Sequence, residues 1–537
     1  THNVSSAASD VYKRQESISK KTERIYDVFI AGGGVNGTGV ARDAAGRGYT
    51  VCLCEMNDFA SGTSSASTKL IHGGLRYLEH YKFRLVQESL KEREILLNMA
   101  PHIIWPMRFI LPHSKGMRPK WFLRLGLALY DHLGFRKILP GTKNVNLSNQ
   151  QKPSPLKDSF NSGFEYSDCW VDDSRLVILN AVDARLKGAQ LKNYTKVINV
   201  ESDNGLWIIT TEDSLTGEVN RVKSKTFVNA SGPWIDEVLK DSFKVKNSKN
   251  VRLIRGSHIV VNKLYDHDKS YICQNKDGRI FFIIPYEDNF TMIGTTDIEH
   301  KGSAGKVQIT EEEKKYICES ASSYLRKSIR IEDIVWSYSG VRPLYDDGAS
   351  KAQEVTRDYV ITAKEYDYSL MINIFGGKIT TYRKLSEAIL EHIEGFLGKR
   401  SNPWTETSSL PGGEFKISML SNLESNLQKK YNFLSNEIIK RLIRSYGQIS
   451  FDIFGDCQDT QSLGEHFGAG LYEIEVIYLL EKEWAKSSND ILFRRSKLGL
   501  SISDKGLKKL DLFIKKYNEE ESVKVNNTSA KKEVDVA

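Results

Sequence analysis

Cysteine is scarce in this chain of 537 residues, and its spacing excludes two kinds of site. The six cysteines form no C-x-x-C pair, so the sequence predicts neither a dithiol redox centre nor a cysteine-held metal, and we expect no metal site. Cys52 and Cys54 alternate along an expected strand and therefore share one face. We interpret them as reduced structural thiols of a cytosolic protein.

Long apolar runs are also absent. No stretch approaches the roughly 18 residues that a membrane-spanning helix needs, and no signal-peptide core is present. Residues 1–24 lack a clear pattern, and we expect a non-native or disordered leader before a native start close to Tyr26. The whole chain is 40% hydrophobic and 27% charged, which is typical of a globular protein with two or three domains.

The clearest positive signal is a strand, a glycine turn, a helix and a second strand within residues 26–55. Gly32, Gly34 and Gly37 have G-x-G-x-x-G spacing, and Glu55 closes the second strand. Such glycines permit a tight turn, close approach of the backbone to a pyrophosphate and close helix packing, while the helix N-terminus favours phosphates. Glu55 is placed to accept hydrogen bonds from an unphosphorylated ribose. The pattern predicts FAD or NAD rather than NADP.

Later stretches also combine small residues, glycines and cations. The hydroxylic loop 58–76 is expected to lie near the dinucleotide. The NASGPW segment 229–234 is either a second contact with the dinucleotide or a plain turn. A buried strand leads into the glycines and cation of residues 376–378, which begin a helix. A cation at a helix start opposes the helix dipole, so we expect Lys378 to have an anionic partner. Arg342 is expected on a Gly/Pro turn that presents it to an anion.

Most of the net charge of +8 comes from residues 112–143, which carry seven Lys or Arg against one acid, Asp131. Aromatic and leucine residues lie among these cations. A short helix of this kind suits the surface of an anionic bilayer. The alternative is an ordinary amphipathic core helix. No nucleic-acid recognition motif is present, so we expect no nucleic-acid partner.

The order of the remaining patterns predicts an α/β fold with three parts. Residues 25–400 are predicted to form a Rossmann-like domain that binds FAD or NAD, interleaved with an antiparallel, β-rich substrate (cap) domain. An all-helical domain is predicted at 401–517, because apolar residues there recur at helical spacing. The polar segment 518–537 is predicted to be disordered. We further expect a loop at 144–158 and an aromatic turn followed by a helix at 164–188.

Several long blocks of the chain are distinctive: AGGGVNGTGVARDAAGRG, TSSASTKLIHGGLRYLEHYKFRLV, GFEYSDCWVDD, NASGPW, RGSHIVV, MIGTTDIE, WSYSGVRPL and FGGKITTYRKL. These blocks resemble those of the bacterial, aerobic, FAD-dependent glycerol-3-phosphate dehydrogenases. The similarity extends over roughly residues 26–510.

The resemblance implies FAD as cofactor, sn-glycerol 3-phosphate as donor and ubiquinone or menaquinone as acceptor. It also implies a monotopic protein on the cytoplasmic face of the inner membrane, and a homodimer is one further expectation. The implied substrate pocket consists of Arg76, Tyr77, His258, Arg342 and Lys378, with His72 close to the flavin. The implied FAD contacts are Gly32, Gly34, Gly37, Glu55, Thr63, Ser64, Ser65, Thr68, Ala230, Gly232, Gly340 and Gly377.

The implied reaction sets three tasks for these side chains. Arg342, with Arg76 or Lys378, would hold the phosphate. A neutral imidazole would take the proton of the C2 hydroxyl, and we rank His258 first and His72 second for this role. Lys378 or Arg76 would stabilise negative charge on that oxygen. His258, His72, Arg76 and Lys378 are therefore the candidate catalytic residues.

Three alternatives stay open at this point. An oxygen-using glycerol-3-phosphate oxidase would share the pocket, although the basic stretch favours the dehydrogenase. A flavin amine or amino-acid oxidase would need one carboxylate clamp, whereas several cations suit a phosphate better. A non-enzymatic protein that binds membranes or nucleic acid would retain the nucleotide fold without its chemistry.

Overall fold

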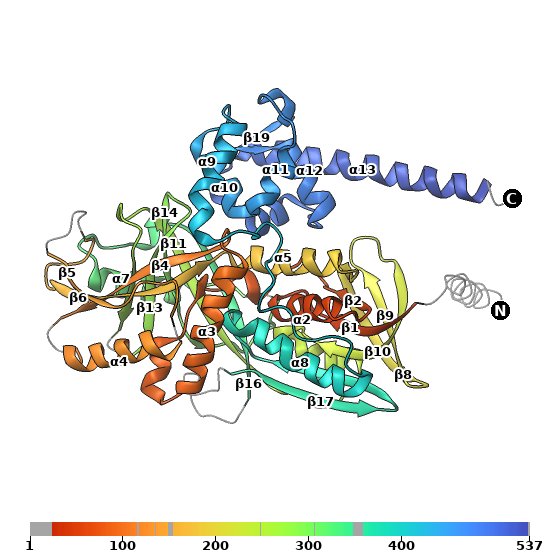
Figure 1. Ribbon diagram of the computed structural model, residues 1–537, viewed down its shortest axis with the longest axis horizontal. Helices are drawn as coiled ribbons and strands as arrows, with labels where there is room; N and C mark the ends of the chain where they lie inside the picture. Colours follow the sequence, from red (N-terminus) through yellow and green to blue (C-terminus); the bar gives the residue numbers. More distant parts are fainter. Residues whose placement is uncertain are drawn as a thin grey trace, which may run out of the picture.

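The computed structural model describes residues 24–114, 117–134, 136–148, 154–246, 249–275, 277–305, 307–346 and 358–534. The expected leader, except for its last residue, and the end of the expected tail lie outside the described residues. Figure 1 shows two sheets side by side, with the C-terminal helices (blue) packed across one end of the molecule.

The first sheet is mixed, with a parallel central part; it has eight strands among the described residues, and its main order is β17-β18-β10-β1-β2-β7. A hairpin adds β8 and β9 beside β10. The parallel strands are β1 (Ile25–Ala31), β2 (Val51–Cys54), β7 (Gln190–Lys192), β10 (Val219–Asn229) and β18 (Ser369–Phe375). The antiparallel strands are β8 (Thr195–Asp203), β9 (Leu206–Asp213) and β17 (Val360–Tyr366).

Alternating side chains of β1 explain how this sheet is covered. Val28 and Ile30 belong to a core that includes three helices, whereas Phe29 and Ala31 pack with the β8–β9 hairpin on the opposite face. Helix α2 lies between α5 and α8 in the helical layer. These helices are α2 (Val35–Gly46), α5 (Asp173–Leu186) and α8 (Tyr382–Leu397).

The second sheet is mostly antiparallel and has ten strands within the described ranges. Its main order is β15-β11-β14-β13-β12-β4-β6-β3, with β16 beside β11 and β5 beside β6. The strands are β3 (Leu70–Ile71), β4 (Ile104–His113), β5 (Lys143–Asn146), β6 (Ser162–Val171), β11 (Val251–Asn262), β12 (Ser270–Gln274), β13 (Ile280–Tyr286), β14 (Phe290–Gly294), β15 (Ile298–Glu299) and β16 (Ile334–Tyr345).

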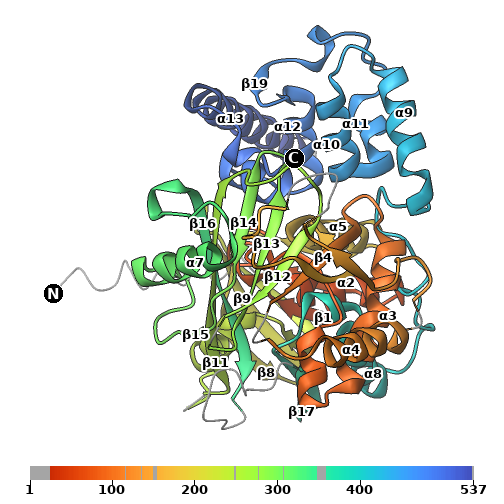
Figure 2. The same cartoon turned by 90° about the vertical axis from the view of Figure 1, so that its left-hand side faces the viewer.

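Helices cover both faces of this second sheet. Figure 2 shows α7 on one side and α3 with α4 on the other. Ile317 of α7 packs with one face, whereas Leu90 of α3 and Leu127 of α4 pack with the other. The helices are α3 (Phe83–Met99), α4 (Lys120–Leu133) and α7 (Glu311–Tyr324).

Three local sequence expectations were wrong. The expected aromatic turn is β6, whose residues are almost all buried, so no alternation of polar and apolar residues marks it as a strand. The expected loop 144–158 contains most of β5. The expected turn around Arg342 is strand β16, and Pro343 fits there because β16 pairs with β11 alone among the described strands.

The C-terminal unit, residues 417–534, is mainly helical and also holds a two-stranded sheet that the all-helical expectation missed. Helix α13 continues to Val534, where a disordered tail was expected. Residues 518–534 contain neither proline nor glycine, so nothing in the sequence interrupts that helix. The elements are α9 (Leu420–Lys430), α10 (Asn436–Tyr446), α11 (Ser450–Phe454), β19 (His466–Gly468), β20 (Leu471–Tyr472), α12 (Glu473–Lys482) and α13 (Asp504–Val534).

Buried ion pairs attach this C-terminal unit to the first sheet. Arg175 on α5 donates from Nη2 to Oε1 of Glu483 over 2.9 Å. Arg495 donates to both carboxylate oxygens of Asp58, over 2.7 and 2.8 Å. All four side chains are at most 1% exposed, so breaking one pair would leave an uncompensated buried charge. The C-terminal unit is therefore fixed against the rest of the chain.

His102 lies in the same contact region and makes the stability of the protein sensitive to acid. The ring is fully buried, and neither nitrogen has a hydrogen-bond partner in the described part of the chain. Burial lowers the pKa of His102 to about 3, assisted by the nearby Arg175 and Arg444. Between that value and about 6.5 the unfolded chain binds a proton that the folded chain does not. The contribution of His102 to stability therefore falls as the pH falls below about 6.5.

We expect His102→Leu to lose less thermal stability than the wild type when the pH is lowered from 7 to 5. A buried neutral histidine contributes up to about 1.4 kcal/mol per pH unit within this window. Melting temperatures measured at both pH values test the prediction. His392→Leu, a change at an exposed position on α8, is the matched control. Equal acid-induced losses in wild type and His102→Leu would contradict the assignment.

Candidate active site

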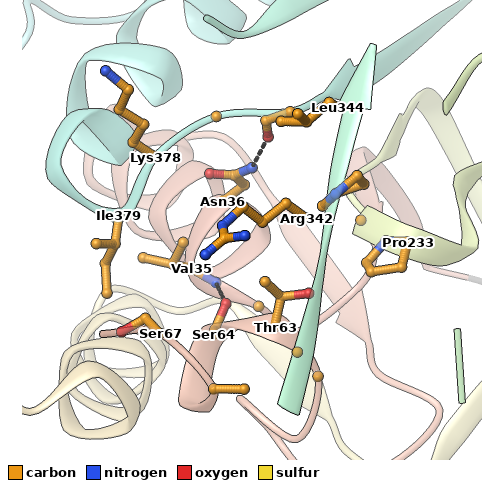
Figure 3. Close-up of a pocket in the computed structure, with 18 of the residues that line it drawn as sticks. Val35, Asn36, Thr63, Ser64, Ser67, Pro233, Arg342, Leu344, Lys378 and Ile379 are labelled. Carbon is orange, nitrogen blue, oxygen red and sulfur yellow. Dashed lines mark hydrogen bonds between the residues drawn. The ribbon is translucent and has the colours of Figure 1, made fainter. Parts of the chain in front are cut away.

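A cavity of about 880 Å³ lies where the two sheets meet. The carboxyl ends of β1, β2, β10 and β18 reach it from the first sheet, and residues of β11, β13 and β16 line it from the second. In open α/β sheets, ligands bind at the carboxyl ends of the parallel strands. Figure 3 shows part of the cavity wall around the start of α2.

The glycine turn after β1 has the geometry that the sequence predicts. Gly32 has φ +114°, and a Cβ atom there would lie 2.5 Å from the carbonyl oxygen of Ala230. A Cβ on Gly37 would lie 2.0 Å from the carbonyl oxygen of Gly32, so neither position accepts a side chain. Gly34 begins α2 without a side-chain cap, which leaves the helix N-terminus available to an anion.

Glu55 faces the cavity from the end of β2, as the sequence predicts. Its Oε2 accepts a hydrogen bond from the backbone N–H of Gly33 over 2.7 Å, and its Oε1 accepts one from Asn57 over 2.9 Å. Burial raises the pKa of this carboxyl, although the backbone donors oppose that effect. Each oxygen keeps a second lone pair that a ribose hydroxyl can use.

All the predicted cofactor residues except two line the cavity. Ser64 Oγ accepts from the N–H of Val35 over 3.0 Å, which joins the loop to the start of α2 (Figure 3). Ser65 does not line the cavity, and Gly37 packs against Gly32 behind it. Those that line the cavity are Gly32, Gly34, Glu55, Thr63, Ser64, Thr68, Ala230, Gly232, Gly340 and Gly377.

Asn36 was missed by the sequence interpretation. It lines the cavity, and its amide nitrogen donates to the carbonyl oxygen of Gly376 over 3.3 Å. Its Oδ1 is buried and has no hydrogen-bond partner among the described residues. An orphaned acceptor beside an uncapped helix N-terminus is a place for a ligand with N–H or O–H donors. Together with the glycine turn and Glu55, it makes the cavity fit FAD.

The predicted cations line another part of the cavity. Arg342 on β16 donates from Nη1 to Oδ1 of Asp297 over 3.1 Å and from Nη2 to Oγ1 of Thr295 over 3.4 Å. The ammonium group of Lys378 lies 4.0 Å from the centre of the Tyr77 ring and points away from Arg342 (Figure 3). Arg76 and Tyr77 follow one another along the same wall. An anionic ligand in this part of the cavity would therefore meet positively charged groups.

The two predicted histidines differ in their access to the cavity. His72 lines it, whereas His258 does not, and only 1% of His258 is exposed. The Nε2 atom of His258 lies 3.0 Å from Oγ1 of Thr68, and its ring is stacked on Tyr338 with centroids 4.8 Å apart. Thr68 therefore lies between His258 and the cavity.

Both histidines are neutral bases at neutral pH. Burial lowers the pKa of His72 to about 4, and the cations Lys378 and Arg93 add to the effect. Burial also lowers the pKa of His258 to about 3, with Arg342 the next contributor. A neutral imidazole can accept a proton from a hydroxyl group, so the chemistry does not separate the two rings, but their exposure does.

A buried network holds the turn that carries His72. The N–H of Gly73 donates to the hydroxyl of Tyr130 over 2.7 Å, and that hydroxyl donates to Oδ1 of Asp168 over 2.8 Å. Arg93 donates to the same oxygen over 2.8 Å. Because Tyr130 belongs to α4, the helix and the His72 turn are fixed together.

Comparisons with known proteins agree with this site. A family model described as FAD dependent oxidoreductase matches residues 27–383, and one described as the C-terminal domain of alpha-glycerophosphate oxidase matches residues 403–522. The D-erythritol 1-phosphate dehydrogenase of Brucella abortus is 47% identical over 89% of this chain and 95% of its own length. The glycerol-3-phosphate dehydrogenase of Pseudomonas aeruginosa is also 47% identical, over 89% of this chain and 93% of its own length.

The aerobic glycerol-3-phosphate dehydrogenase of Escherichia coli is 43% identical over 92% of this chain and 98% of its own length. A solved structure of the glycerol-3-phosphate dehydrogenase from Bacillus halodurans, complexed with FAD, has a TM-score of 0.68 and 28% identity, and covers 90% of this chain and 88% of that one. The predicted α/β fold class, the cofactor FAD and the family resemblance are thereby confirmed. The chain belongs to the family of FAD-dependent oxidoreductases that includes the bacterial glycerol-3-phosphate dehydrogenases.

Proposed function

We propose that this protein oxidises sn-glycerol 3-phosphate to dihydroxyacetone phosphate and passes the electrons to a membrane quinone. The observation that carries the proposal is a single cavity that combines a dinucleotide turn, three cations and a neutral histidine. Relatives named glycerol-3-phosphate dehydrogenase, at 43–47% identity, support the same substrate. Bound FAD supplies the acceptor for the hydride and its two electrons.

Different residues of the cavity suit the separate steps of this reaction. Arg342 presents a planar fork suited to two phosphate oxygens, and Arg76 or Lys378 supplies a second charge. A neutral imidazole takes the proton of the C2 hydroxyl as the hydride leaves C2. The remaining cation stabilises the negative charge that develops on that oxygen. Tyr77 holds Lys378 at the cavity wall through the contact with its ring.

Anaerobic mixing with sn-glycerol 3-phosphate tests this function through the flavin spectrum. We expect the oxidised flavin absorption to bleach, to recover fast with a quinone analogue and to recover slowly with oxygen. Fast recovery with oxygen and release of peroxide would instead establish the oxidase alternative. Bound flavin that does not bleach would refute the substrate.

D-erythritol 1-phosphate is a second candidate substrate, because the relative named for it is as similar to this chain, at 47% identity, as a glycerol-3-phosphate dehydrogenase is. Both compounds present a phosphate and adjacent hydroxyl groups, so the same cations suit either. The ratio of the two kcat/KM values, measured with the same quinone analogue, decides which substrate the protein prefers.

We further propose that α4 lies on an anionic membrane surface at the cytoplasmic face of the inner membrane, where it brings the protein to its quinone. Trp121 is 69% exposed and Leu125 is 61% exposed, whereas Leu127 and Tyr130 anchor the opposite side of the helix in the core. Lys120 and Arg124 of the helix itself are exposed and add positive charge. Among the described helices, none combines the length and the hydropathy that crossing a bilayer requires.

The double change Trp121→Ser and Leu125→Ser is expected to lower binding to vesicles of anionic phospholipid by at least about tenfold, because each apolar side chain contributes about 1.5–3 kcal/mol when it leaves water. Co-sedimentation with vesicles measures the effect. Leu512→Ser on α13 is the matched control, because Leu512 is also 69% exposed but lies on the C-terminal unit. Unchanged binding of the double variant would exclude α4 as the contact.

A further inference from the structure

No residue of the C-terminal unit lines the cavity: among the described residues, the last one along the chain that lines it is Thr380. The C-terminal unit nevertheless reaches the back of the cavity wall through cations: Arg495 pairs with Asp58, and Lys497 reaches the start of α5. We propose that Lys497 is a positioning residue for the flavin-side loop, residues 63–68, and that it acts on this loop through Asp173. The proposal rests on FAD binding by the chain and is independent of the substrate.

Lys497 points from the C-terminal unit into the start of α5. Its Nζ donates to Oγ of Ser174 over 2.6 Å and lies 3.5 Å from Oδ1 of Asp172 and 3.7 Å from Oδ1 of Asp173. The side chain is only 8% exposed, and its backbone has φ +58°, an uncommon conformation for a lysine. A buried ammonium group in a constrained backbone is held in one place.

Asp173 transmits this contact to the loop. The residue is fully buried, and its Oδ1 accepts from Nζ of Lys69 over 2.8 Å. Its Oδ2 accepts from Oγ of Ser67 over 2.7 Å. Lys69 in turn donates to the carbonyl oxygen of Ser65 over 3.0 Å. One carboxylate therefore fixes the loop at two points, directly through Ser67 and through the Lys69 ammonium at Ser65.

The loop connects Asp173 to the cavity wall. Ser67 and Thr68 line the cavity directly. The hydroxyl of Tyr338 donates to the carbonyl oxygen of Ser67 over 2.9 Å, and the ring of Tyr338 is stacked on the ring of His258. Thr68 contacts the same histidine. A displacement of Asp173 would move both the cavity wall and the support of His258.

Lys497 supplies one of the two ammonium groups that compensate the carboxylates of this cluster. Two ammonium groups, on Lys69 and Lys497, face the carboxylates of Asp172 and Asp173. Burial acts to raise the pKa of Asp173, but Lys69 and Lys497 hold it below its usual value. Without Lys497, the buried carboxylate of Asp173 and the partly exposed one of Asp172 would face one ammonium group, and uncompensated buried charge is strongly unfavourable. We expect the loop, which Asp173 holds at two points, to shift in response.

Lys497→Met tests the proposal, because it keeps the apolar stem and removes the charge. We expect the dissociation constant of FAD, titrated into deflavinated protein, to rise by at least about tenfold, the equivalent of about 1.4 kcal/mol. The visible absorption bands of the bound flavin should also shift. Lys497→Arg should restore most of the affinity. Lys509→Met is the matched control, since Lys509 pairs with Glu465 at the surface of the same unit, and it should leave both readouts unchanged.

FAD affinity and a flavin spectrum equal to those of the wild type in Lys497→Met would overturn the proposal, even if the melting temperature fell. If Lys497→Met does not fold, Asp173→Asn decides the matter, because it removes the transmitting charge at a position that does not line the cavity. A rise of at least about tenfold in the FAD dissociation constant would then support the proposal, and an unchanged constant would overturn it.

Discussion

Arg342→Ala is expected to lower kcat/KM for sn-glycerol 3-phosphate by roughly 30- to 5,000-fold, which corresponds to about 2–5 kcal/mol. Hydrogen bonds to Asp297 and Thr295 hold the guanidinium in position at the cavity wall. Gly256 of the neighbouring strand leaves room for it, because a Cβ atom there would lie 2.6 Å from Nη2 of Arg342. Removing the fork would leave a phosphate in the cavity with one charge fewer.

Steady-state kinetics of two further variants show whether the loss in kcat/KM comes from the guanidinium fork of Arg342. Arg342→Lys keeps the charge but loses the fork, so its kcat/KM should fall between those of wild type and Arg342→Ala. Arg252→Ala is the matched control, since Arg252 lies on the adjacent strand β11 and pairs with Glu299 outside the cavity. The greater part of the loss should appear in KM, because a phosphate contact is made before and during the reaction. A loss of less than about tenfold would remove Arg342 from the proposed phosphate site.

The dinucleotide corner was predictable because every part of it is local. The glycine spacing, the strand and the acid lie within residues 26–55, and each is required by backbone geometry at that turn. The helix expected within residues 164–188 was likewise found, as α5 (Asp173–Leu186). Such features depend on neighbours in sequence, and periodicity and glycine spacing report on those neighbours directly.

The remaining features depend on contacts between distant residues. Strand β6 is buried on both faces, so its composition resembles that of an aromatic turn as much as that of a strand. Lys69 and Asp173 are 104 residues apart, and no spacing rule connects them to each other or to Lys497. The different exposure of His72 and His258 follows from the placement of Thr68, because both histidines lie close to glycines in sequence. Tertiary packing decides each of these cases.

His72→Gln is expected to lower kcat by about 10²- to 10⁴-fold, whereas His258→Gln should lower it by less than about tenfold. The sequence interpretation ranked His258 first, but only His72 lines the cavity. A general base must reach the proton that it removes, directly or through one intermediate group. Because burial lowers the pKa of His72 to about 4, the ring stays unprotonated well below pH 6.5. The acid limb of kcat/KM should therefore lie below pH 6.5, and activity should fall only as the pH approaches that lowered pKa.

Thr68→Val separates this assignment from the one other route that the geometry offers. The hydroxyl of Thr68 lines the cavity and lies 3.0 Å from Nε2 of His258, so a proton could pass through it to that ring. If it does, Thr68→Val and His258→Gln will show similar losses of at least about 10²-fold in kcat, while His72→Gln stays close to wild type. That pattern would refute His72 as the base. A large loss in His72→Gln alone, with bound FAD unchanged in all three variants, is the result that the exposure of the two rings predicts.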